Sequence, residues 1–526
     1  MSLVEVTDLT VGFGSLRAVD GLSFRLAKGA ALGLVGESGS GKSTVASALL
    51  GLHRGTGADV GGSVRVAGID VQEASDAELR RLRGGKAAMV FQDPLSSLDP
   101  YYAVGDQIAE VYRVHVKASR RAARARAVEV LDRVGIPDAA RRARSRPHEF
   151  SGGMRQRALI AMALACEPDL LIADEPTTAL DVTVQAQILD LLHTLREETG
   201  MGLLLVTHDV GVAAESVDEI LVMRHGRGVE HGLVGAVLGA PARAYTQELL
   251  GAVPRVDAPR TASAVTEEVV LEASGLRREF GRGKKAFAAV DDVSLTIHRG
   301  ETLGIVGESG SGKTTLGRML VGLLEPTAGE IKPGGGVRPD VQMVFQDPVS
   351  SLNPRRSVGE SIADPLRAQG ERDEGRIRGR VRELLERVGL EAAHYGRYPH
   401  EFSGGQRQRV GIARALAADP RVIVCDEPVS ALDVTTQAQV IALLAELQRE
   451  LGLALVFVAH DLAVVRQVSD RVAVMRRGRI VEYGPADEVY ESPRDPYTKQ
   501  LLAAVPALDP EVAARRRTAR SRLTVV

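Results

Sequence analysis

The chain of 526 residues exceeds the size of one ordinary domain, so its length predicts about two to four domains. Hydrophobic residues make up 44% of the chain and charged residues 25%, a globular mixture that excludes a disordered protein. The 66 basic residues nearly balance the 68 acidic ones, which argues against an overall electrostatic field for nucleic acid.

The N-terminal and apolar segments favour a protein that does not cross a membrane by itself. The first residues, MSLVEVTDLTVGFGS, lack the charged and then apolar pattern of a signal peptide. The most apolar runs, such as LLLV and LALVFVA, are far shorter than the roughly 20 residues that cross a bilayer. The cysteines Cys166 and Cys425 are too few for a disulfide framework, a cysteine-rich zinc site or a cysteine-ligated iron–sulfur cluster, and they fit a reducing cytoplasm. We therefore expect a soluble or peripheral protein.

The sequence contains one set of motifs twice, in the same order. GLVGESGSGKST recurs as GIVGESGSGKTT, and MVFQDPLSSLDP recurs as MVFQDPVSSLNP. PHEFSGGMRQR recurs as PHEFSGGQRQR, and ADEPTTALDVT recurs as CDEPVSALDVT. A repeat of this length is a duplicated domain rather than a solenoid unit. We predict a first domain over residues 1–256, a linker over 257–268, where proline and small polar residues break the hydrophobic period, and a second domain over 269–526.

The order of elements within each copy predicts an α/β fold. LGLVG and LGIVG are short apolar runs that end in glycine, as buried parallel strands do. LLIADEP, LLLVTHD, VIVCDEP and LVFVAHD are further apolar runs that end in acidic or imidazole groups. Ligands of open α/β sheets bind at the carboxyl ends of the strands, where these polar groups would lie. An extra stretch, Ala58–Gly85, with the helical segment ASDAELRRLR, occurs only in the first copy.

Each copy begins with a glycine-rich loop that matches the pattern Gly-x4-Gly-Lys-Ser/Thr. Glycines allow the backbone N–H groups to approach phosphates at the N-terminus of a helix. Lys42 and Lys313 would reach the β- and γ-phosphates of ATP, and the hydroxyls of Ser43 and Thr314 would bind Mg²⁺. The first predicted loop comprises Gly36, Glu37, Ser38, Gly39, Ser40, Gly41, Lys42, Ser43 and Thr44, and the second comprises Gly307, Glu308, Ser309, Gly310, Ser311, Gly312, Lys313, Thr314 and Thr315.

An Asp-Glu pair follows a later apolar run in each copy. We predict that Asp174 and Asp426 orient Mg²⁺. Glu175 and Glu427 would then act as general bases that polarise the attacking water. An isolated Asp-Glu pair is usually a solvated surface feature, but its place after a phosphate loop in both copies favours the functional interpretation.

Histidines and glutamines complete the predicted site. His208 and His460 follow apolar strands and are expected to contact the γ-phosphate. Gln92 and Gln346 lie at the ends of the MVFQ strands and are expected to touch Mg²⁺ or the attacking water. Both copies retain the lysine, the glutamate and the histidine, which predicts two competent sites.

The serine-glycine-glycine motif resembles the signature of ATP-binding-cassette (ABC) ATPases. This resemblance implies two tandem P-loop NTPase domains, each a RecA-like α/β core with an antiparallel β subdomain and a helical signature subdomain. It also implies that the two cassettes pair within one chain, so that each signature completes the ATP site of the other copy. By this resemblance Asp181 and Asp433 link the sites across the interface. The first signature, expected opposite Lys313, is Ser151, Gly152 and Gly153, and the second, expected opposite Lys42, is Ser403, Gly404 and Gly405.

Aromatic residues near the first strands are candidates for stacking on adenine. Phe13 is the candidate in the first copy, and Phe280 is the candidate in the second, with Phe287 as an alternative. An aromatic residue near a strand is more often part of the core.

Further motifs are similar to those of the ATPase subunits of peptide and nickel importers. These are FQDPxSSLxP, PHEFSGG and the segments ARAYTQELLGAVP and RDPYTKQLLAAVP. The resemblance implies ATP hydrolysis that powers import of di- or oligopeptides through two separate membrane-spanning permease subunits, with an extracytoplasmic substrate-binding protein. It places the chain at the cytoplasmic face of the cell membrane, as a peripheral protein. No cysteine follows Cys425, so an iron–sulfur centre is not expected.

Several alternatives stay open. The same engine could drive import of nickel or another small solute, or export of drugs or peptides. Soluble fused cassettes also act on ribosomes or DNA, but the short join and the lack of coiled coils or zinc cysteines argue against nucleic acid as a partner. We interpret the arginine-rich stretch Arg120–Arg146 as an amphipathic helix with a solvated basic face. The tail ARRRTARSRL is expected to be a mobile basic end, with anionic lipid headgroups as an alternative partner.

Overall fold

The computed structural model divides the chain into two compact units, each with one copy of the repeat. Unit 1 comprises Met1–Val253 and Pro506–Val526, and unit 2 comprises Pro254–Val505. The structure describes residues 2–178, 180–257, 265–281, 283, 286–333, 341–347, 351–430 and 432–523. No helix within these ranges has the length and apolar character that a membrane span requires.

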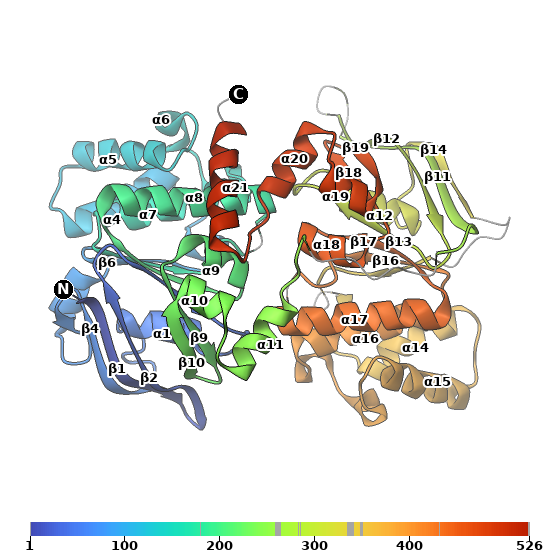
Figure 1. The fold of residues 1–526 in the computed structure, drawn as a ribbon, viewed down its shortest axis with the longest axis horizontal. Helices are drawn as coiled ribbons and strands as arrows, with labels where there is room; N and C mark the ends of the chain where they lie inside the picture. The colour runs from blue at the N-terminus through green and yellow to red at the C-terminus, as the bar shows by residue number, and fades with distance from the viewer. Residues whose placement is uncertain are drawn as a thin grey trace. The chain divides into compact units, whose positions relative to one another are not determined.

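A six-stranded sheet, parallel except for one edge strand, forms the core of unit 1 (Figure 1). Alternate residues of β3 pack into two different hydrophobic clusters: Ala31 and Val35 into one, Leu32 and Leu34 into the other. Because both faces of the sheet are covered, every position of the strand is buried, which explains the uninterrupted apolar run. In spatial order the strands are β10 (Arg227–Leu233), β9 (Glu219–Arg224), β3 (Ala31–Val35), β8 (Gly202–Thr207), β7 (Leu170–Asp174) and β6 (Ala87–Val90).

An antiparallel sheet and a group of helices complete unit 1. The sheet has the order β2 (Leu16–Ala27), β1 (Ser2–Phe13), β4 (Asp59–Val66) and β5 (Ile69–Asp70). Helices α4, α5 and α7 pack on one another and lie apart from β1 and β2 (Figure 1). The helices are α1 (Lys42–Leu49), α2 (Asp76–Leu82), α3 (Pro94–Ser97), α4 (Val104–His115), α5 (Arg120–Arg133), α6 (Ala139–Arg142), α7 (Gly152–Leu164), α8 (Val182–Thr199), α9 (Val210–Ser216), α10 (Val234–Gly239), α11 (Ala244–Ala252) and α21 (Pro510–Leu523).

Unit 2 repeats this architecture. Its six-stranded sheet has the order β15 (Val341–Val344), β16 (Val422–Asp426), β17 (Ala454–Val458), β13 (Thr302–Val306), β18 (Arg471–Arg476) and β19 (Arg479–Pro485). Its antiparallel sheet has the order β12 (Phe287–His298), β11 (Val269–Phe280) and β14 (Ala328–Pro333). The helices are α12 (Lys313–Leu320), α14 (Val358–Ala368), α15 (Glu374–Arg387), α16 (Gly404–Leu416), α17 (Val434–Leu451), α18 (Leu462–Val468), α19 (Ala486–Glu491) and α20 (Pro496–Ala503). The predicted α/β class, with its antiparallel sheet and helical group in each copy, is confirmed.

The extra stretch of the first copy forms an arm, which we define as residues 67–86. Its helix α2 starts with a capping box, in which Ser75 N–H donates to Glu78 Oε2 (2.8 Å) and Glu78 N–H donates to Ser75 Oγ (3.3 Å). Leu79 and Leu82 of α2 are buried in a hydrophobic cluster of unit 1. In unit 2, residues 334–340 of the shorter counterpart lie outside the described residues.

The basic stretch that was predicted as an amphipathic helix contains α5. Its buried residues are Ala123, Ala127, Val130 and Leu131, while most of its arginines are exposed. An arginine-rich sequence forms a stable surface helix here because one apolar stripe packs on α4 and α7.

The chain divides differently from the predicted domain boundaries at its C-terminal end. Residues 506–526 belong to unit 1, although the predicted second domain runs to residue 526. Residues 258–264 of the predicted linker lie outside the described residues.

The prediction of a mobile basic tail, made for the segment ARRRTARSRL (residues 514–523), is wrong, because this segment belongs to helix α21, which packs against α9 of unit 1. Arg520 Nη2 lies 2.9 Å from Asp190 Oδ1 and 3.4 Å from Glu215 Oε2. The Glu215 side chain is only 2% exposed, and the N–H of Ala507 also donates to it (3.3 Å). The counterparts of Asp190 and Glu215 in the second copy are the uncharged Ala442 and Gln467. Within the described residues, the acidic side chains that pair with Arg520 therefore belong to unit 1.

Candidate functional site

The first phosphate loop lies between the end of β3 and the start of α1. Gly41 has φ 97°, and a Cβ atom there would lie 2.3 Å from the carbonyl oxygen of Ala18, so only glycine fits. Lys42 is 5% exposed, and its Nζ donates to the carbonyl oxygens of Gly36 and Glu37 (both 2.8 Å). The loop thus holds a buried cation beside the first N–H groups of a helix, an arrangement that suits phosphate.

The second phosphate loop repeats this geometry between β13 and α12. Gly312 has φ 106°, and a Cβ atom would lie 2.2 Å from the carbonyl oxygen of Ala289. Lys313 Nζ donates to the carbonyl oxygens of Gly307 (2.7 Å) and Glu308 (2.9 Å). The two loops agree in conformation as well as in sequence.

A hydroxyl and a carboxylate meet beside each loop. Ser43 Oγ donates to Asp174 Oδ1 (3.0 Å), and Thr314 Oγ1 donates to Asp426 Oδ1 (3.1 Å). Burial raises the pKa of Asp174 to about 6 and also raises the pKa of Asp426, while the hydroxyl hydrogen bonds offset part of this effect. Hard oxygen donors of this kind suit Mg²⁺, and a divalent cation would supply the positive charge that these buried carboxylates lack.

Glu175 is the centre of a polar cluster in unit 1. It follows the last residue of β7 and has φ 47°, a left-handed conformation that is strained for a glutamate. Its carboxylate lies 3.1 Å from His208 Nδ1, accepts a hydrogen bond from Gln92 Nε2 (2.8 Å) and accepts another from Thr178 Oγ1 (2.9 Å). Residues that follow the three neighbouring strands β6, β7 and β8 therefore meet at one carboxylate.

Glu427 occupies the corresponding place in unit 2, with φ 46°. Its Oε2 lies 3.4 Å from His460 Nδ1 and accepts a hydrogen bond from Gln346 Nε2 (2.7 Å). Ser430, the counterpart of Thr178, donates instead to the main-chain carbonyl of Glu427 (3.1 Å). The carboxylate of unit 2 thus lacks the hydroxyl contact that Thr178 makes in unit 1.

In each histidine–glutamate pair, the contact shifts the pKa values of both partners in the direction that favours their charged forms. Burial favours the neutral form of Glu175, but the hydrogen bond and charge of His208 outweigh it and hold the pKa of the carboxyl below its usual value. Burial likewise lowers the pKa of His208, and the contact with Glu175 outweighs it and raises that pKa. The pKa values of Glu427 and His460 move in the same directions for the same reasons. An ionised carboxylate at this position can accept a proton from water.

Thr178 is a site residue that the sequence analysis missed. Its hydroxyl binds the carboxylate of Glu175 directly. The available signal was the hydroxyl residue three positions after the glutamate in both copies, in ADEPTTALD and CDEPVSALD.

The signature serines cap helices. Ser151 Oγ accepts the N–H of Met154 at the start of α7, and Ser403 Oγ accepts the N–H of Gln406 at the start of α16 (both 3.3 Å). Both serines are exposed. In the described part of each unit, no hydrogen bond joins a signature serine to the phosphate loop of the same unit. The serines are free to face a ligand that another surface presents.

The remaining signature residues include one glycine with a packing role in each copy. A Cβ atom on Gly153 would lie 2.4 Å from Val184 Cγ1, and one on Gly405 would lie 2.3 Å from Thr436 Cγ2. Gly152 and Gly404 precede them at the first helical position. Close packing of α7 on α8 and of α16 on α17 therefore requires Gly153 and Gly405, irrespective of any ligand.

Asp181 and Asp433 are helix caps. Asp181 Oδ1 accepts the N–H of Val184 (3.0 Å) at the start of α8, and Asp433 Oδ1 accepts the N–H of Thr436 (2.9 Å) at the start of α17. The capping role explains an aspartate at this position within each unit.

The first adenine candidate lies next to its phosphate loop. The ring of Phe13 is 5.5 Å from that of His53, whose Nε2 lies 3.0 Å from the carbonyl oxygen of Thr44. In unit 2 the rings of Phe280 and Phe287 lie 5.9 Å apart on paired strands. The alternative between these two phenylalanines therefore stays open.

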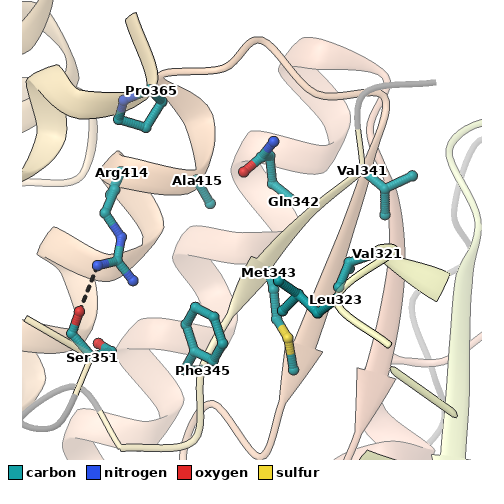
Figure 2. Close-up of a pocket in the computed structure, with 10 residues that line it drawn as sticks. All are labelled: Val321, Leu323, Val341, Gln342, Met343, Phe345, Ser351, Pro365, Arg414 and Ala415. Atoms are coloured by element: carbon teal, nitrogen blue, oxygen red, sulfur yellow. Dashed lines mark hydrogen bonds between the residues drawn. The ribbon is translucent and has the colours of Figure 1, made fainter. Parts of the chain in front are cut away.

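Unit 2 also contains a pocket of about 580 Å³ near Gln346 (Figure 2). Phe345, Met343 and the exposed Leu323 line it from the sheet side, and Pro365 of α14 and Arg414 of α16 line it from the helical group. The side chain of Arg414 points toward Ser351 and donates to its carbonyl oxygen (2.6 Å). The pocket thus lies between the helical group and β15, the strand that precedes Gln346.

Two family models match the chain. The model described as "ABC transporter" matches residues 19–178 and 290–430, which include both phosphate loops and both acidic motifs. The model described as "Oligopeptide/dipeptide transporter, C-terminal region" matches residues 229–280 and 481–524.

Relatives are similar over nearly the whole chain. The "Glutathione import ATP-binding protein GsiA" of Salmonella choleraesuis (strain SC-B67) is 46% identical over 561 residues, which cover 97% of this chain and 90% of the relative. The protein of the same name from Escherichia coli (strain K12) is 46% identical over 562 residues, with the same coverage. The ABC transporter model matches more than half of the chain, and the relatives are 46% identical to it. The chain therefore belongs to the ABC transporter family, as an ATPase with two tandem cassettes.

Proposed function

We propose that this ABC ATPase powers the import of short peptides, with glutathione as one candidate cargo, through separate membrane subunits. The observation that carries the proposal is the oligopeptide/dipeptide C-terminal region, which follows the cassette in both copies. Relatives named for glutathione import match along 97% of the chain, so both cassettes and both C-terminal regions take part in the similarity. We refer to the repeated parts of units 1 and 2 as the first and second cassettes.

The chemistry follows from the residues around each phosphate loop. Mg²⁺ supplies charge neutralisation at the β- and γ-phosphates when it is bound. Lys42 and Lys313 would bind these phosphates, and the Ser43–Asp174 and Thr314–Asp426 pairs would hold the metal. Gln92 and Gln346 add a further oxygen near the metal or the attacking water.

The glutamates and histidines act on the attacking water. Glu175 and Glu427 are ionised and hydrogen-bonded within their clusters, so each can orient a water molecule and accept its proton. His208 and His460 contact these carboxylates and would also contact the γ-phosphate of ATP. Neither cassette lacks a member of this set, which supports two competent sites.

Each ATP site is completed by the signature of the other cassette. Ser151 and Ser403 cap exposed helix N-termini, where N–H groups and a hydroxyl favour an anion. ATP then makes contacts that exist only in the closed arrangement, and it shifts the equilibrium toward closure. Hydrolysis removes these contacts and allows reopening.

The partners are two membrane-spanning permease subunits and an extracytoplasmic substrate-binding protein, and the chain acts at the cytoplasmic face of the membrane. The pocket beside Gln346 is a candidate receptor for a short helix of a permease subunit. The arm of the first cassette supports this choice of occupant, because its amphipathic helix α2 buries Leu79 and Leu82 beside the corresponding part of unit 1. A movement of the pocket walls would reach the glutamine through Phe345.

The test is purification of the chain from its native membranes, followed by uptake of labelled glutathione and dipeptides into vesicles that hold the purified assembly. We expect two polytopic membrane proteins to co-purify and ATP-dependent uptake to occur. The variant Glu175→Gln with Glu427→Gln should bind ATP but lose hydrolysis and uptake by about a hundredfold or more.

The matched control is Glu198→Gln with Glu450→Gln, which changes the exposed counterpart glutamates of α8 and α17 and should retain activity. Co-purification with ribosomes or DNA alone would refute transport. Substantial hydrolysis by the doubly substituted variant would refute the assigned bases.

A further inference from the structure

The peptide unit between Gly307 and Glu308 in the second phosphate loop is held from both sides. Its carbonyl oxygen, that of Gly307, accepts a hydrogen bond from Lys313 Nζ (2.7 Å). Its N–H donates to the hydroxyl oxygen of Tyr497 (3.0 Å), a residue of helix α20. Tyr497 is 2% exposed and lies in the C-terminal region of the oligopeptide/dipeptide type rather than in the cassette itself. A side chain outside the nucleotide motifs thus contacts the same peptide unit as the phosphate-binding lysine.

Helix α20 fixes the position of this tyrosine. Glu482 of β19 accepts the N–H groups of Arg494 (2.7 Å) and Asp495 (3.2 Å), which anchors the start of the helix. Asp495 then caps α20 by accepting the N–H of Tyr497 (2.7 Å). The guanidinium of Arg476, at the end of β18, lies 4.6 Å from the centre of the Tyr497 ring. Each of these contacts restricts the ring, so the hydroxyl is directed at the loop.

A second contact ties the same region to the loop. The N–H of Gly478, in the turn between β18 and β19, donates to the carbonyl oxygen of Ser311 (2.9 Å). The loop backbone is therefore supported at Glu308 by the C-terminal region and at Ser311 by the neighbouring hairpin. In the first cassette the counterpart Tyr245 is likewise buried, at 6% exposed, and lies 4.4 Å from the guanidinium of Arg224.

We propose that Tyr497 is a positioning residue for ATP binding, which acts by holding the Gly307–Glu308 peptide unit and through it the ammonium group of Lys313. This inference rests on the phosphate-binding role proposed above for Lys313. Removal of the hydroxyl leaves a part-buried N–H without its partner and allows the peptide unit to rotate away from the lysine. A loop that samples several conformations binds phosphate more weakly, because only one of them is competent. The C-terminal region thereby becomes part of the support of the ATP site.

The experiment compares Tyr497→Phe with Tyr490→Phe. Tyr490 is a buried tyrosine of the preceding helix α19, and its hydroxyl donates to the carbonyl oxygen of Leu462 (2.6 Å) rather than to the phosphate loop. Both variants are made in the full chain with Lys42→Ala, which disables the first loop, and Glu427→Gln, which prevents hydrolysis at the second. Binding of radiolabelled ATP with Mg²⁺ and the thermal unfolding midpoint are measured for each.

We expect Tyr497→Phe to weaken ATP binding about tenfold relative to the parent, and Tyr490→Phe to leave ATP binding unchanged. In the otherwise native chain, Tyr497→Phe should raise the KM for ATP and leave kcat within about twofold, a split that general loosening of the fold would not produce. Equal ATP affinity in the two variants would overturn the inference while leaving the ATP site intact. Absence of ATP binding in the Lys42→Ala, Glu427→Gln parent would instead refute the role of Lys313 and the inference with it.

Discussion

The two cassettes differ at the arm. The first cassette has the arm, residues 67–86, and the second has a shorter segment at the same place in the sequence. In the first cassette, Arg83 at the end of α2 donates to the carbonyl oxygens of Leu50 (2.7 Å) and Gly51 (2.8 Å), and the N–H of Gly84 donates to Ala87 (2.8 Å). In the second cassette the counterparts of Leu50 and Ala87, which are Val321 and Val341, line the pocket of about 580 Å³. The surface that the arm contacts in the first cassette thus corresponds to a wall of the pocket among the described residues of the second.

The residues around the nucleotide site differ far less between the copies. The lysine–carbonyl, hydroxyl–aspartate and glutamine–glutamate contacts recur with lengths that agree within a few tenths of an ångström. The differences lie in Thr178 against Ser430, in Met154 against Gln406 and in the acids that bind α21. The duplication has therefore kept most of the contacts around the two phosphate loops, while a few neighbouring positions and the acids that bind α21 differ.

The largest expected effect concerns the pairing of signatures with sites. In a Glu427→Gln background only the site of Lys42 and Glu175 hydrolyses ATP, and Ser403→Ala should lower its turnover about a hundredfold, because a preorganised donor to the transition state is lost. Ser151→Ala in the same background is the matched control and should have little effect. Steady-state ATPase rates check this, and the reverse order of the two effects would contradict the cross-cassette pairing.

The second prediction concerns the C-terminal helix, whose acidic partners among the described residues belong to unit 1. Arg520→Ala removes the ion-pair partner of the buried Glu215, which should lower the free energy of unfolding of unit 1 by about 2 kcal/mol. Scanning calorimetry should show the transition of unit 1 about 5 °C lower and that of unit 2 unchanged.

Arg515→Ala, on an exposed position of the same helix, serves as the control and should leave both transitions in place. A shift of both transitions, or of neither, in Arg520→Ala would show that α21 does not support unit 1 specifically.

The third prediction concerns the open pocket of the second cassette. Leu323 is 60% exposed, so Leu323→Glu should fold normally, bind ATP normally and weaken association with the membrane subunits about tenfold, because a charge must be desolvated when an apolar helix docks. Leu233→Glu, at a leucine of the first cassette that is 65% exposed, is the control. Quantitative co-purification would distinguish them, and equal recovery of the permeases would argue against docking in this pocket.

The smallest expected effect concerns the hydroxyl beside the general base. Thr178→Ala removes one hydrogen bond to the carboxylate of Glu175, worth about 1 kcal/mol, and should lower the turnover of the first site about fivefold. Ser430→Ala removes only a contact to a main-chain carbonyl and should change the second site by less than about twofold. The ATP turnover of each variant is measured with the other cassette inactivated. Equal effects would show that the different contacts of Thr178 and Ser430 do not change the rate of hydrolysis.

Sequence reasoning succeeded where a function is encoded in a short contiguous segment. The loop Gly36–Thr44 contains its own turn glycines, its lysine and its helix start, so its structure follows from local constraints such as the space available at Gly41. The acidic motifs could be predicted equally well. An apolar strand that ends at Asp174 and is followed by Glu175 places both residues at the carboxyl end of the strands. The amphipathic character of α5 was visible as a period of small and apolar residues.

The same reasoning failed where a residue's role depends on a distant partner. The basic tail was interpreted as mobile, because a run of arginines is as compatible with solvent as with a protein surface. Its docking depends on Asp190 and Glu215, which are about three hundred positions away in the chain. The part that Tyr497 plays at Glu308 was hidden for the same reason, since nothing near either residue indicates the other.

By itself, then, the sequence determined that this protein consists of two α/β cassettes, each with a phosphate loop, an acidic motif, a histidine and a signature. These features are local, and their backbone and side-chain requirements are met within a few residues. Only the tertiary structure decided that Gln92, His208 and Thr178 converge on Glu175, that the arm packs against Leu50 and Gly51 of the first cassette, and that the C-terminal helix binds unit 1. Such contacts arise from packing and from charges brought together by the folded chain, and no period or spacing along the sequence encodes them.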